Sequence, residues 1–269
     1  MDGHAPLGQA PPTMRVLFVA DLHYELKQFD WLMLRAANFD AVIIGGDLLE
    51  LGSTLELDVQ IVVVEKYLAR LCQQGRLLVS SGNHDGDARS AADESICNWL
   101  RDLKTGQLFV DGDSVELSDK LITICPWWDG PVSRAEVESL LARDAQKTKK
   151  QWIWIHHCPP DKSPVSWAGK KFGGDEFLVE WIQRYQPDLV LSGHIHNAPF
   201  NSKGSWNDRI GRTWVFNPGR QIGPAPAHLV FDLDKMSVAW TSLADQATKQ
   251  LDVPTPSGIS GPADAAADA

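Results

Sequence analysis

Short apolar segments alternate along the chain with longer segments in which apolar residues recur every three or four positions. The short segments are nearly continuous runs of Val, Ile, Leu, Phe and Trp, which predicts strands covered on both faces. The predicted strands are 15–20, 41–44, 76–80, 120–124, 152–155, 188–191, 213–216, 228–231 and 237–240. The three- and four-residue spacing predicts helices near 27–37, 55–74, 91–103, 133–147 and 174–185.

The order of these elements favours one α/β domain. Strand and helix alternate at first and strands dominate later, which is typical of a sandwich of sheets with helices outside. Residues 1–13 are rich in Pro, Gly and Ala and predict a flexible leader, and the acidic, small-residue segment 252–269 predicts a disordered tail. The domain is therefore expected to span 14–251.

Polar residues follow five of the predicted strands directly. They are Asp21 and His23, then Asp47, then Asn83, His84 and Asp85, then His156 and His157, and finally His194 and His196. Ligands bind beyond the carboxyl ends of strands in α/β sheets, so we expect these side chains to converge there. Alternating spacing, as in His194-Ile195-His196, lets an extended segment direct two side chains the same way.

The chemistry of this set is mixed oxygen and nitrogen ligation. It could bind one metal ion with ligands to spare, or two metal ions that share a carboxylate. Carboxylate oxygen together with imidazole suits Mn²⁺, Fe²⁺ or Fe³⁺, Zn²⁺, Co²⁺ or Ni²⁺ better than Ca²⁺.

The net charge of the chain bears on which classes of partner it can bind. The chain has 269 residues, with 25 Lys and Arg against 35 Asp and Glu and a net charge of −10. A net negative chain disfavours binding to nucleic acid. The N-terminus lacks the pattern of a signal peptide, no segment has the length of a membrane span, and the four cysteines lack CxxC spacing. These features predict a soluble, cytoplasmic protein.

The blocks D-x-H, GD, GNHD, H-x-P-P and GHxH occur in this order, and a later FNPG turn occupies 216–219. Their order resembles that of the calcineurin-like metallophosphoesterase superfamily over about residues 14–242. The resemblance implies a four-layer αββα sandwich of two mixed sheets with flanking helices, and a metal site at the carboxyl ends of the strands.

The resemblance also implies roles for individual residues in a site with two divalent metal ions. Asp21, His23 and His196 would hold the first ion. Asn83, His157 and His194 would hold the second. Asp47 would bridge the ions, and His84 would face the scissile phosphate without binding metal. Asp85 would brace the loop.

Two positions leave the assignment open. Family spacing favours His157 as the ligand, whereas simple continuation of the preceding strand would present His156 equally well, with the other imidazole supporting the ligands. Glu50 stands where protein phosphatases of the superfamily carry the Asp that orients the catalytic His, and their Arg is missing. These departures disfavour a Ser/Thr protein phosphatase and the related dinucleoside polyphosphate hydrolases.

The expected activity is hydrolysis of a small phosphodiester or phosphomonoester by a hydroxide, held by two metal ions, that attacks phosphorus in line. The alternatives are a manganese-dependent DNA nuclease and an inactive binding scaffold of the same fold. The filled ligand positions argue against the scaffold. Trp127 and Trp128 follow a predicted strand and are candidates either for the pocket border or for packing.

Overall fold

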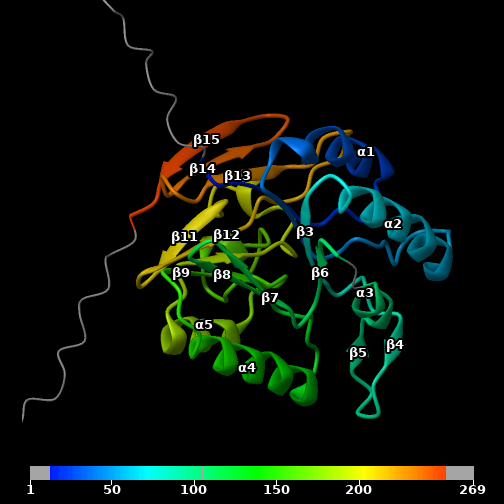
Figure 1. Cartoon of the computed structure of the whole chain (residues 1–269), viewed down its shortest axis with the longest axis horizontal. Helices are drawn as coiled ribbons and strands as arrows, with labels where there is room; N and C mark the ends of the chain where they lie inside the picture. Colours follow the sequence, from blue (N-terminus) through cyan, green and yellow to red (C-terminus); the bar gives the residue numbers. More distant parts are fainter. Residues whose placement is uncertain (1–12, 104–105, 253–269) are drawn as a thin grey trace, which may run out of the picture.

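The computed structural model describes residues 13–103 and 106–252 (Figure 1). Apart from Thr13 and Asp252, the predicted leader and tail lie outside the described residues. The α-helices are α1 (Leu26–Arg35), α2 (Leu57–Leu71), α3 (Asn98–Asp102), α4 (Pro131–Ala145) and α5 (Glu176–Tyr185). Short 3₁₀ turns occupy Ala36–Asn38, Pro164–Ser166 and Ala198–Phe200. In the described ranges, none of the helices combines the length and apolar character that crossing a membrane requires.

The first sheet has seven strands in the order β15-β14-β13-β1-β2-β3-β6. They are β15 (Gln246–Gln250), β14 (Ser237–Thr241), β13 (His228–Asp232), β1 (Arg15–Val19), β2 (Ala41–Gly45), β3 (Arg76–Ser80) and β6 (Leu108–Phe109). β1, β2, β3 and β6 are parallel, and the other strands pair antiparallel. The carboxyl ends of β1, β2 and β3 therefore meet at one edge.

The second sheet has six strands in the order β11-β12-β10-β9-β8-β7. They are β11 (Asn207–Ile210), β12 (Thr213–Phe216), β10 (Leu189–Leu191), β9 (Gln151–Ile155), β8 (Lys120–Ile124) and β7 (Ser114–Leu117). Its four central strands are parallel, and β7 and β11 are antiparallel edges. A separate hairpin pairs β4 (Ala88–Arg89) with β5 (Ser95–Ile96).

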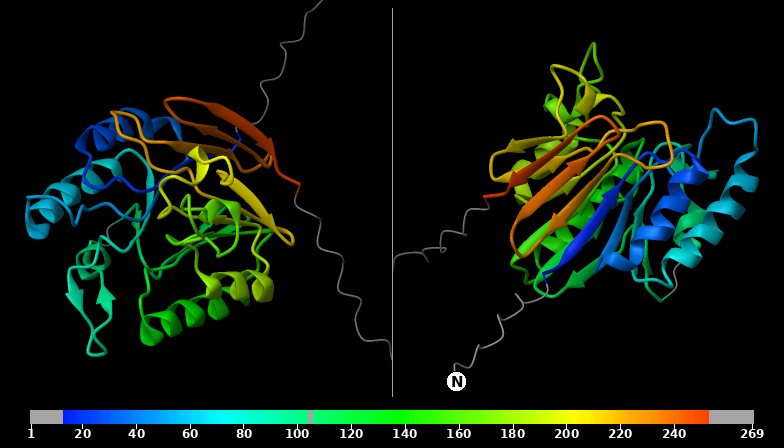
Figure 2. Two further views of the ribbon diagram at one scale, coloured as in Figure 1. Left: turned by 180° about the vertical axis from the view of Figure 1, so that it is seen from behind. Right: turned by 90° about the horizontal axis from the view of Figure 1, so that it is seen from above.

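Three apolar layers hold the sheets and helices together. Phe18 of β1 and Ile153 of β9 belong to the layer between the two sheets. The other face of the first sheet packs on α1 and α2 through residues such as Leu32 and Val64, and the second sheet packs on α4 and α5. Figure 2 shows the helices outside the sheets. The predicted four-layer αββα sandwich is confirmed.

Capping residues fix where two helices begin. Pro131 starts α4, and the Glu94 carboxylate accepts hydrogen bonds from the backbone N–H groups of Val132 (2.8 Å) and Ser133 (2.6 Å). In α5, the Asp175 carboxylate accepts from two N–H groups of the first turn. α5 consequently begins at Glu176, two residues after the predicted start.

The structure corrects the sequence prediction in three places. The predicted helix 91–103 is wrong over most of its length, because Ser95–Ile96 pairs in a hairpin and only Asn98–Asp102 is helical. β13 and β14 are not covered on both faces, since buried and partly exposed residues alternate along them. The short edge strands β6, β7, β11 and β15 were not predicted, because pairing rather than an apolar run defines them.

Candidate active site

The loops that follow β1 and β2 are joined by their backbones. The N–H of Asp21 donates to the carbonyl of Gly46 (3.1 Å), and the N–H of His23 donates to that of Asp47 (2.9 Å). Asp21, His23 and Asp47 have positive φ angles of 56°, 44° and 52°, and His194 has one of 64°. Such angles are costly for residues other than glycine, and this concentration at one edge is typical of a functional site.

Two glycines let these loops approach each other closely. A Cβ atom at Gly46, whose φ is +91°, would lie 2.4 Å from His157 Nδ1. A Cβ atom at Gly82 would lie 2.2 Å from Asp47 Oδ1. Only glycine therefore leaves room for the polar side chains at both positions.

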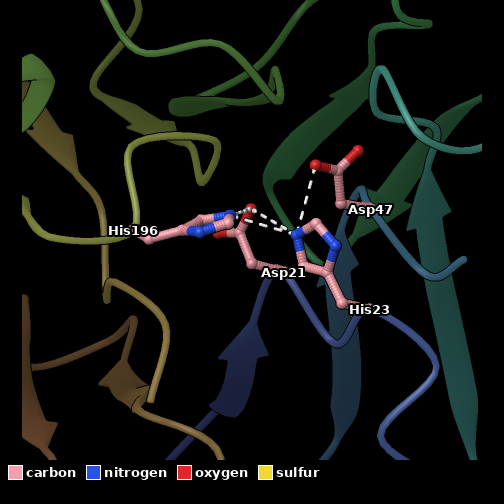
Figure 3. A group of neighbouring side chains, drawn as sticks. All are labelled: Asp21, His23, Asp47 and His196. Atoms are coloured by element: carbon pink, nitrogen blue, oxygen red, sulfur yellow. Dashed lines mark hydrogen bonds and ion pairs between the residues drawn. The ribbon is translucent and has the colours of Figure 1, made fainter. Parts of the chain in front are cut away.

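Four side chains form the first candidate metal group: Asp21, His23, Asp47 and His196. Figure 3 shows them directed toward one another from three separate loops. His23 Nε2 and His196 Nε2 lie 3.0 Å apart, and Asp21 Oδ1 lies 3.4 Å from His196 Nε2. Nitrogen and oxygen lone pairs thus converge on one point, as the ligands of a cation do.

The second candidate group contains Asp47, His157 and His194. Asp47 Oδ2 lies 3.1 Å from His157 Nε2. His194 Nδ1 lies 2.8 Å from the side-chain oxygen of Asn83, which brings the amide of the GNHD block to the same place. The structure therefore brings together all seven residues predicted as ligands.

Asp47 belongs to both groups. Its Oδ2 atom lies 3.5 Å from His23 Nε2 in the first group, as well as 3.1 Å from His157 Nε2 in the second. Its Oδ1 atom accepts a hydrogen bond from the backbone N–H of His84 at 2.9 Å, which fixes the carboxylate. Asp47 therefore lies between the two candidate groups and contacts a histidine of each.

Several buried atoms of this cluster lack hydrogen bonds. Asp21 Oδ2 and His157 Nε2 are both buried without a hydrogen-bond partner. His157 Nδ1 lies 2.6 Å from the carbonyl of Gly45 and can donate its proton there, which leaves the lone pair on Nε2 directed at the cluster. Unpaired buried polar atoms are costly unless a ligand satisfies them, so these residues fit divalent cations.

Burial and charge set the protonation states in the cluster. Burial lowers the pKa of His23 to about 4, and burial together with the charge of His157 lowers that of His194 to about 4. Burial opposes ionisation of Asp47, but the positive charge of His157 outweighs it and holds the pKa of Asp47 well below its usual range. Burial also lowers the pKa of His157, yet the charge of Asp47 outweighs it and raises the pKa to about 9. A proton on His157 thus occupies the place where a cation would sit.

The two adjacent histidines point in opposite directions. His157 faces Asp47, whereas His156 Nε2 lies 3.7 Å from Asp175 Oδ2 and its ring packs on Trp181 of α5. His156 Nδ1 lies 2.9 Å from the carbonyl of Cys158. The geometry therefore directs His157, and not His156, into the cluster.

His84 and Glu50 lie against the His23 end of the cluster. The ring centroids of His84 and His23 are 4.5 Å apart. The backbone N–H of Leu51 donates to His84 Nδ1 at 3.3 Å, so the proton of the neutral ring lies on Nε2. The His84 side chain is 23% exposed, and that of His196 is 34% exposed, while Asp21 and His157 are fully buried. A phosphate can therefore reach the cluster from the side of His84 and His196.

Three buried side chains hold the loops in place. The Asp85 carboxylate accepts from the N–H groups of Leu48, Leu49 and Gly82 and so joins the GD loop to the GNHD loop. The other two bind backbone groups: Gln60 of α2 bonds the backbone of Glu50 and Leu55, and Asn217 of the FNPG turn donates to the carbonyls of Val165, Gly193 and Ile195. The sequence analysis missed Gln60, because a glutamine within a helix carries no signal of such a role.

A comparison of the sequence with models of known protein families identifies the family of this chain. The calcineurin-like phosphoesterase model matches residues 14–198. The chain belongs to this family. The predicted family is thereby confirmed, and the protein is a metal-dependent hydrolase of phosphoester bonds. A search of curated proteins finds no match to the chain.

Solved structures with a similar fold include known phosphatases. The protein TT1561 of Thermus thermophilus aligns with a TM-score of 0.56 and 14% identity over 90% of this chain and 100% of that one. A dimetal phosphatase from Danio rerio aligns with a TM-score of 0.52 and 10% identity, again over 90% and 100%. The purple acid phosphatase PPD1 from yellow lupin (Lupinus luteus) seeds aligns with a TM-score of 0.53 and 14% identity over 91% of this chain and 52% of its own. At these identities the likeness concerns the fold.

Proposed function

We propose that this phosphoesterase hydrolyses small phosphodiesters or phosphomonoesters with two divalent cations. Asp21, His23 and His196 would hold the first cation. Asn83, His157 and His194 would hold the second. Asp47 would bind both. The observation that carries the proposal is the position of Asp47 Oδ2, 3.5 Å from His23 Nε2 and 3.1 Å from His157 Nε2.

Two bound cations would offset the negative charge of the phosphate and lower the pKa of water at the site. The family binds divalent metals, and buried, unpaired ligand atoms in both groups support this interpretation. Manganese, iron, zinc, cobalt and nickel all suit such a set of oxygen and imidazole ligands. Asp21 and Asp47 together supply two negative charges, so two divalent cations would leave the pocket positive.

His84 is the proposed acid for the leaving group. The Leu51 N–H occupies Nδ1, so the Nε2–H is available to donate a proton to the departing alkoxide. General acid catalysis of this kind contributes roughly 10²–10⁴-fold to a rate. Because its ring is partly exposed beside the cluster, His84 can contact a phosphate ester that enters from solvent.

The charge of the chain favours small substrates over DNA. A net charge of −10 repels a polyanion at long range, whereas a single phosphate responds to the local charge of the site. Hydrolysis of small phosphate esters is therefore favoured over the alternative activity, cleavage of DNA.

The test measures metal content and activity on one sample. The purified protein is stripped with a chelator and reloaded with Mn²⁺, and its metal is counted by mass spectrometry. Its rates are then measured on bis(p-nitrophenyl) phosphate, p-nitrophenyl phosphate and single-stranded DNA. We expect two ions per chain and hydrolysis of the small esters. One ion per chain, or cleavage of DNA in preference to both esters, contradicts the proposal.

A further inference from the structure

A pocket of about 400 Å³ lies beside the cluster, at the start of α5. Its walls are formed by three aromatic and three acidic side chains, among others: Trp127, Trp128, Phe177, Asp161, Asp175 and Glu176. This volume is within the range of small-molecule sites, about 300–1,000 Å³. No residue of the metal cluster lines this pocket or the larger cavity between α3 and α4, but the Trp127 ring of this pocket lies next to two histidines of the cluster.

Trp127 connects this aromatic–acidic pocket to the cluster. Its ring centroid lies 5.5 Å from that of His194 and 5.9 Å from that of His157. Its backbone N–H donates to Ser81 Oγ at 2.9 Å, next to the GNHD block, which fixes the loop. A group attached to a phosphate at the cluster can therefore extend along Trp127 into the pocket.

The charge of the pocket is negative and partly uncompensated. Within residues 13–103 and 106–252, no hydrogen bond or ion pair engages the carboxylate of Asp161 or that of Glu176. No Lys, Arg or His is among the residues that line the pocket, but the Arg134 guanidinium lies over two of its rings, 4.0 Å from the Phe177 centroid and 5.8 Å from that of Trp128. Two carboxylates beside indole and phenyl rings are the surroundings that attract an organic cation.

The backbone N–H groups at the start of α5 are not available to bind an anion in this pocket. Asp175 Oδ1 accepts from the backbone N–H groups of Phe177 and Leu178, and Asp175 Oδ2 accepts from Trp128 Nε1 at 3.0 Å. The donors that would attract a second phosphate are thus already occupied. The same bonds hold Trp128 as a rigid wall.

We propose that this pocket binds a cationic substituent of the substrate, such as the quaternary ammonium group of an amino alcohol esterified to the phosphate. The proposal rests on the proposed phosphoesterase activity and narrows its substrates to diesters with one cationic ester group. The pocket borders the His157 and His194 end of the cluster, whereas His84 lies against His23 at the other end. The cationic group is therefore the one retained on phosphorus.

The bond changes follow from this orientation. Water adds its oxygen to phosphorus, and the bond from phosphorus to the ester oxygen near His84 breaks. The leaving oxygen takes the electron pair of that bond, and an alkyl alkoxide takes a proton from His84. The attacking water releases one proton to solvent, and His84 regains its proton from solvent, so the step leaves His84 unchanged. The products are a phosphomonoester of the amino alcohol and the second alcohol.

The experiment compares two substrates of equal shape on the Mn²⁺-loaded protein. They are p-nitrophenyl phosphorylcholine and p-nitrophenyl 3,3-dimethylbutyl phosphate, in which carbon replaces the ammonium nitrogen and the leaving group is the same. We expect kcat/KM to be at least about tenfold higher for the choline ester. In the double variant Asp161→Asn, Glu176→Gln this ratio should fall to within about twofold of one. Glu180→Gln, on the exposed part of α5 outside the pocket, is the matched control and should keep the ratio.

A binding measurement without metal separates the two proposals. Choline and 3,3-dimethylbutanol are titrated into the metal-free protein, and the intrinsic tryptophan fluorescence is followed. Saturable quenching by choline alone, lost in the double variant, supports the cation pocket independently of catalysis. Equal rates on the two esters together with no response to choline overturn it while leaving the phosphoesterase intact. Failure to hydrolyse any ester with metal bound refutes the proposed function instead.

Discussion

The Glu50 carboxylate lies 3.2 Å from His23 Nδ1 through its Oε2 atom. Its Oε1 atom lies 3.6 Å from His84 Nδ1, and Arg220 approaches Oε2 to 4.0 Å. Gln60, fully buried in α2, bonds the N–H and the carbonyl of Glu50 and fixes its backbone. Glu50 therefore links a proposed metal ligand to the proposed acid, at the position where the family's protein phosphatases carry an Asp.

The first prediction concerns this carboxylate. In Glu50→Gln, His23 loses its anionic partner, and such partners of metal-binding imidazoles are worth about 10–100-fold in metal affinity. We expect Mn²⁺ affinity, measured by competition with a chelator, to fall within that range. Glu56→Gln, an exposed glutamate in the same loop, is the control. Unchanged affinity in Glu50→Gln would show that Glu50 does not position His23.

The second prediction separates acid catalysis from metal binding. His84→Ala should keep both ions, because the ligands proposed for them do not include His84, which forms a separate candidate group with His23 and Glu50. Its kcat should fall by about 10²–10⁴-fold on an alkyl ester, and less on a p-nitrophenyl ester, whose leaving group needs no proton. Equal losses on the two esters would argue against the proton-donor role.

The third prediction distinguishes the adjacent histidines. His157→Ala removes the group that faces Asp47 at 3.1 Å and should lose one ion and most activity. His156→Ala removes a ring that packs on Trp181 and should lower the melting temperature while both ions stay bound. Metal counting on the folded variants decides between them, and loss of metal only from His156→Ala would reverse the assignment.

The fourth prediction concerns pH and a buried acid behind the site. Burial outweighs the hydrogen bonds from Ser81 and raises the pKa of Asp111 from its ordinary value of 3.8 to about 6. The folded protein therefore keeps this proton where the unfolded chain has released it. The contribution of Asp111 to the free energy of unfolding is largest below about pH 4. It falls as the pH rises to about 6 and is constant above that pH, and the total change is up to about 3 kcal/mol.

Asp111→Asn should remove this part of the pH dependence. Chemical unfolding at several pH values between 4 and 7 measures it, and Asp102→Asn, an exposed residue of α3, should keep the slope of the original protein. An identical slope in Asp111→Asn and the original protein would mean that Asp111 ionises in the folded state as it does when unfolded.

The sequence predicted the central strands well and indicated which polar residues lie near one another, because both depend on local order. Each parallel strand is a short apolar run, and the polar residues follow it within a few positions. Edge strands such as Gln246–Gln250 escaped prediction, because they are mostly exposed and owe their conformation to a neighbour. Residues 91–96, which include the second strand of the hairpin, were predicted as helix, since spacing alone does not reveal pairing.

The sequence by itself determined that imidazoles, carboxylates and an amide gather where parallel strands end. Tertiary structure decided which of them face one another. In β9, Trp154 points to the helices and Ile155 to the other sheet, so by alternation His156 turns to α5 and His157 to Asp47. Because successive side chains of a strand point to opposite faces, the two histidines must diverge. Only the packing of the two sheets determines which face holds the cluster.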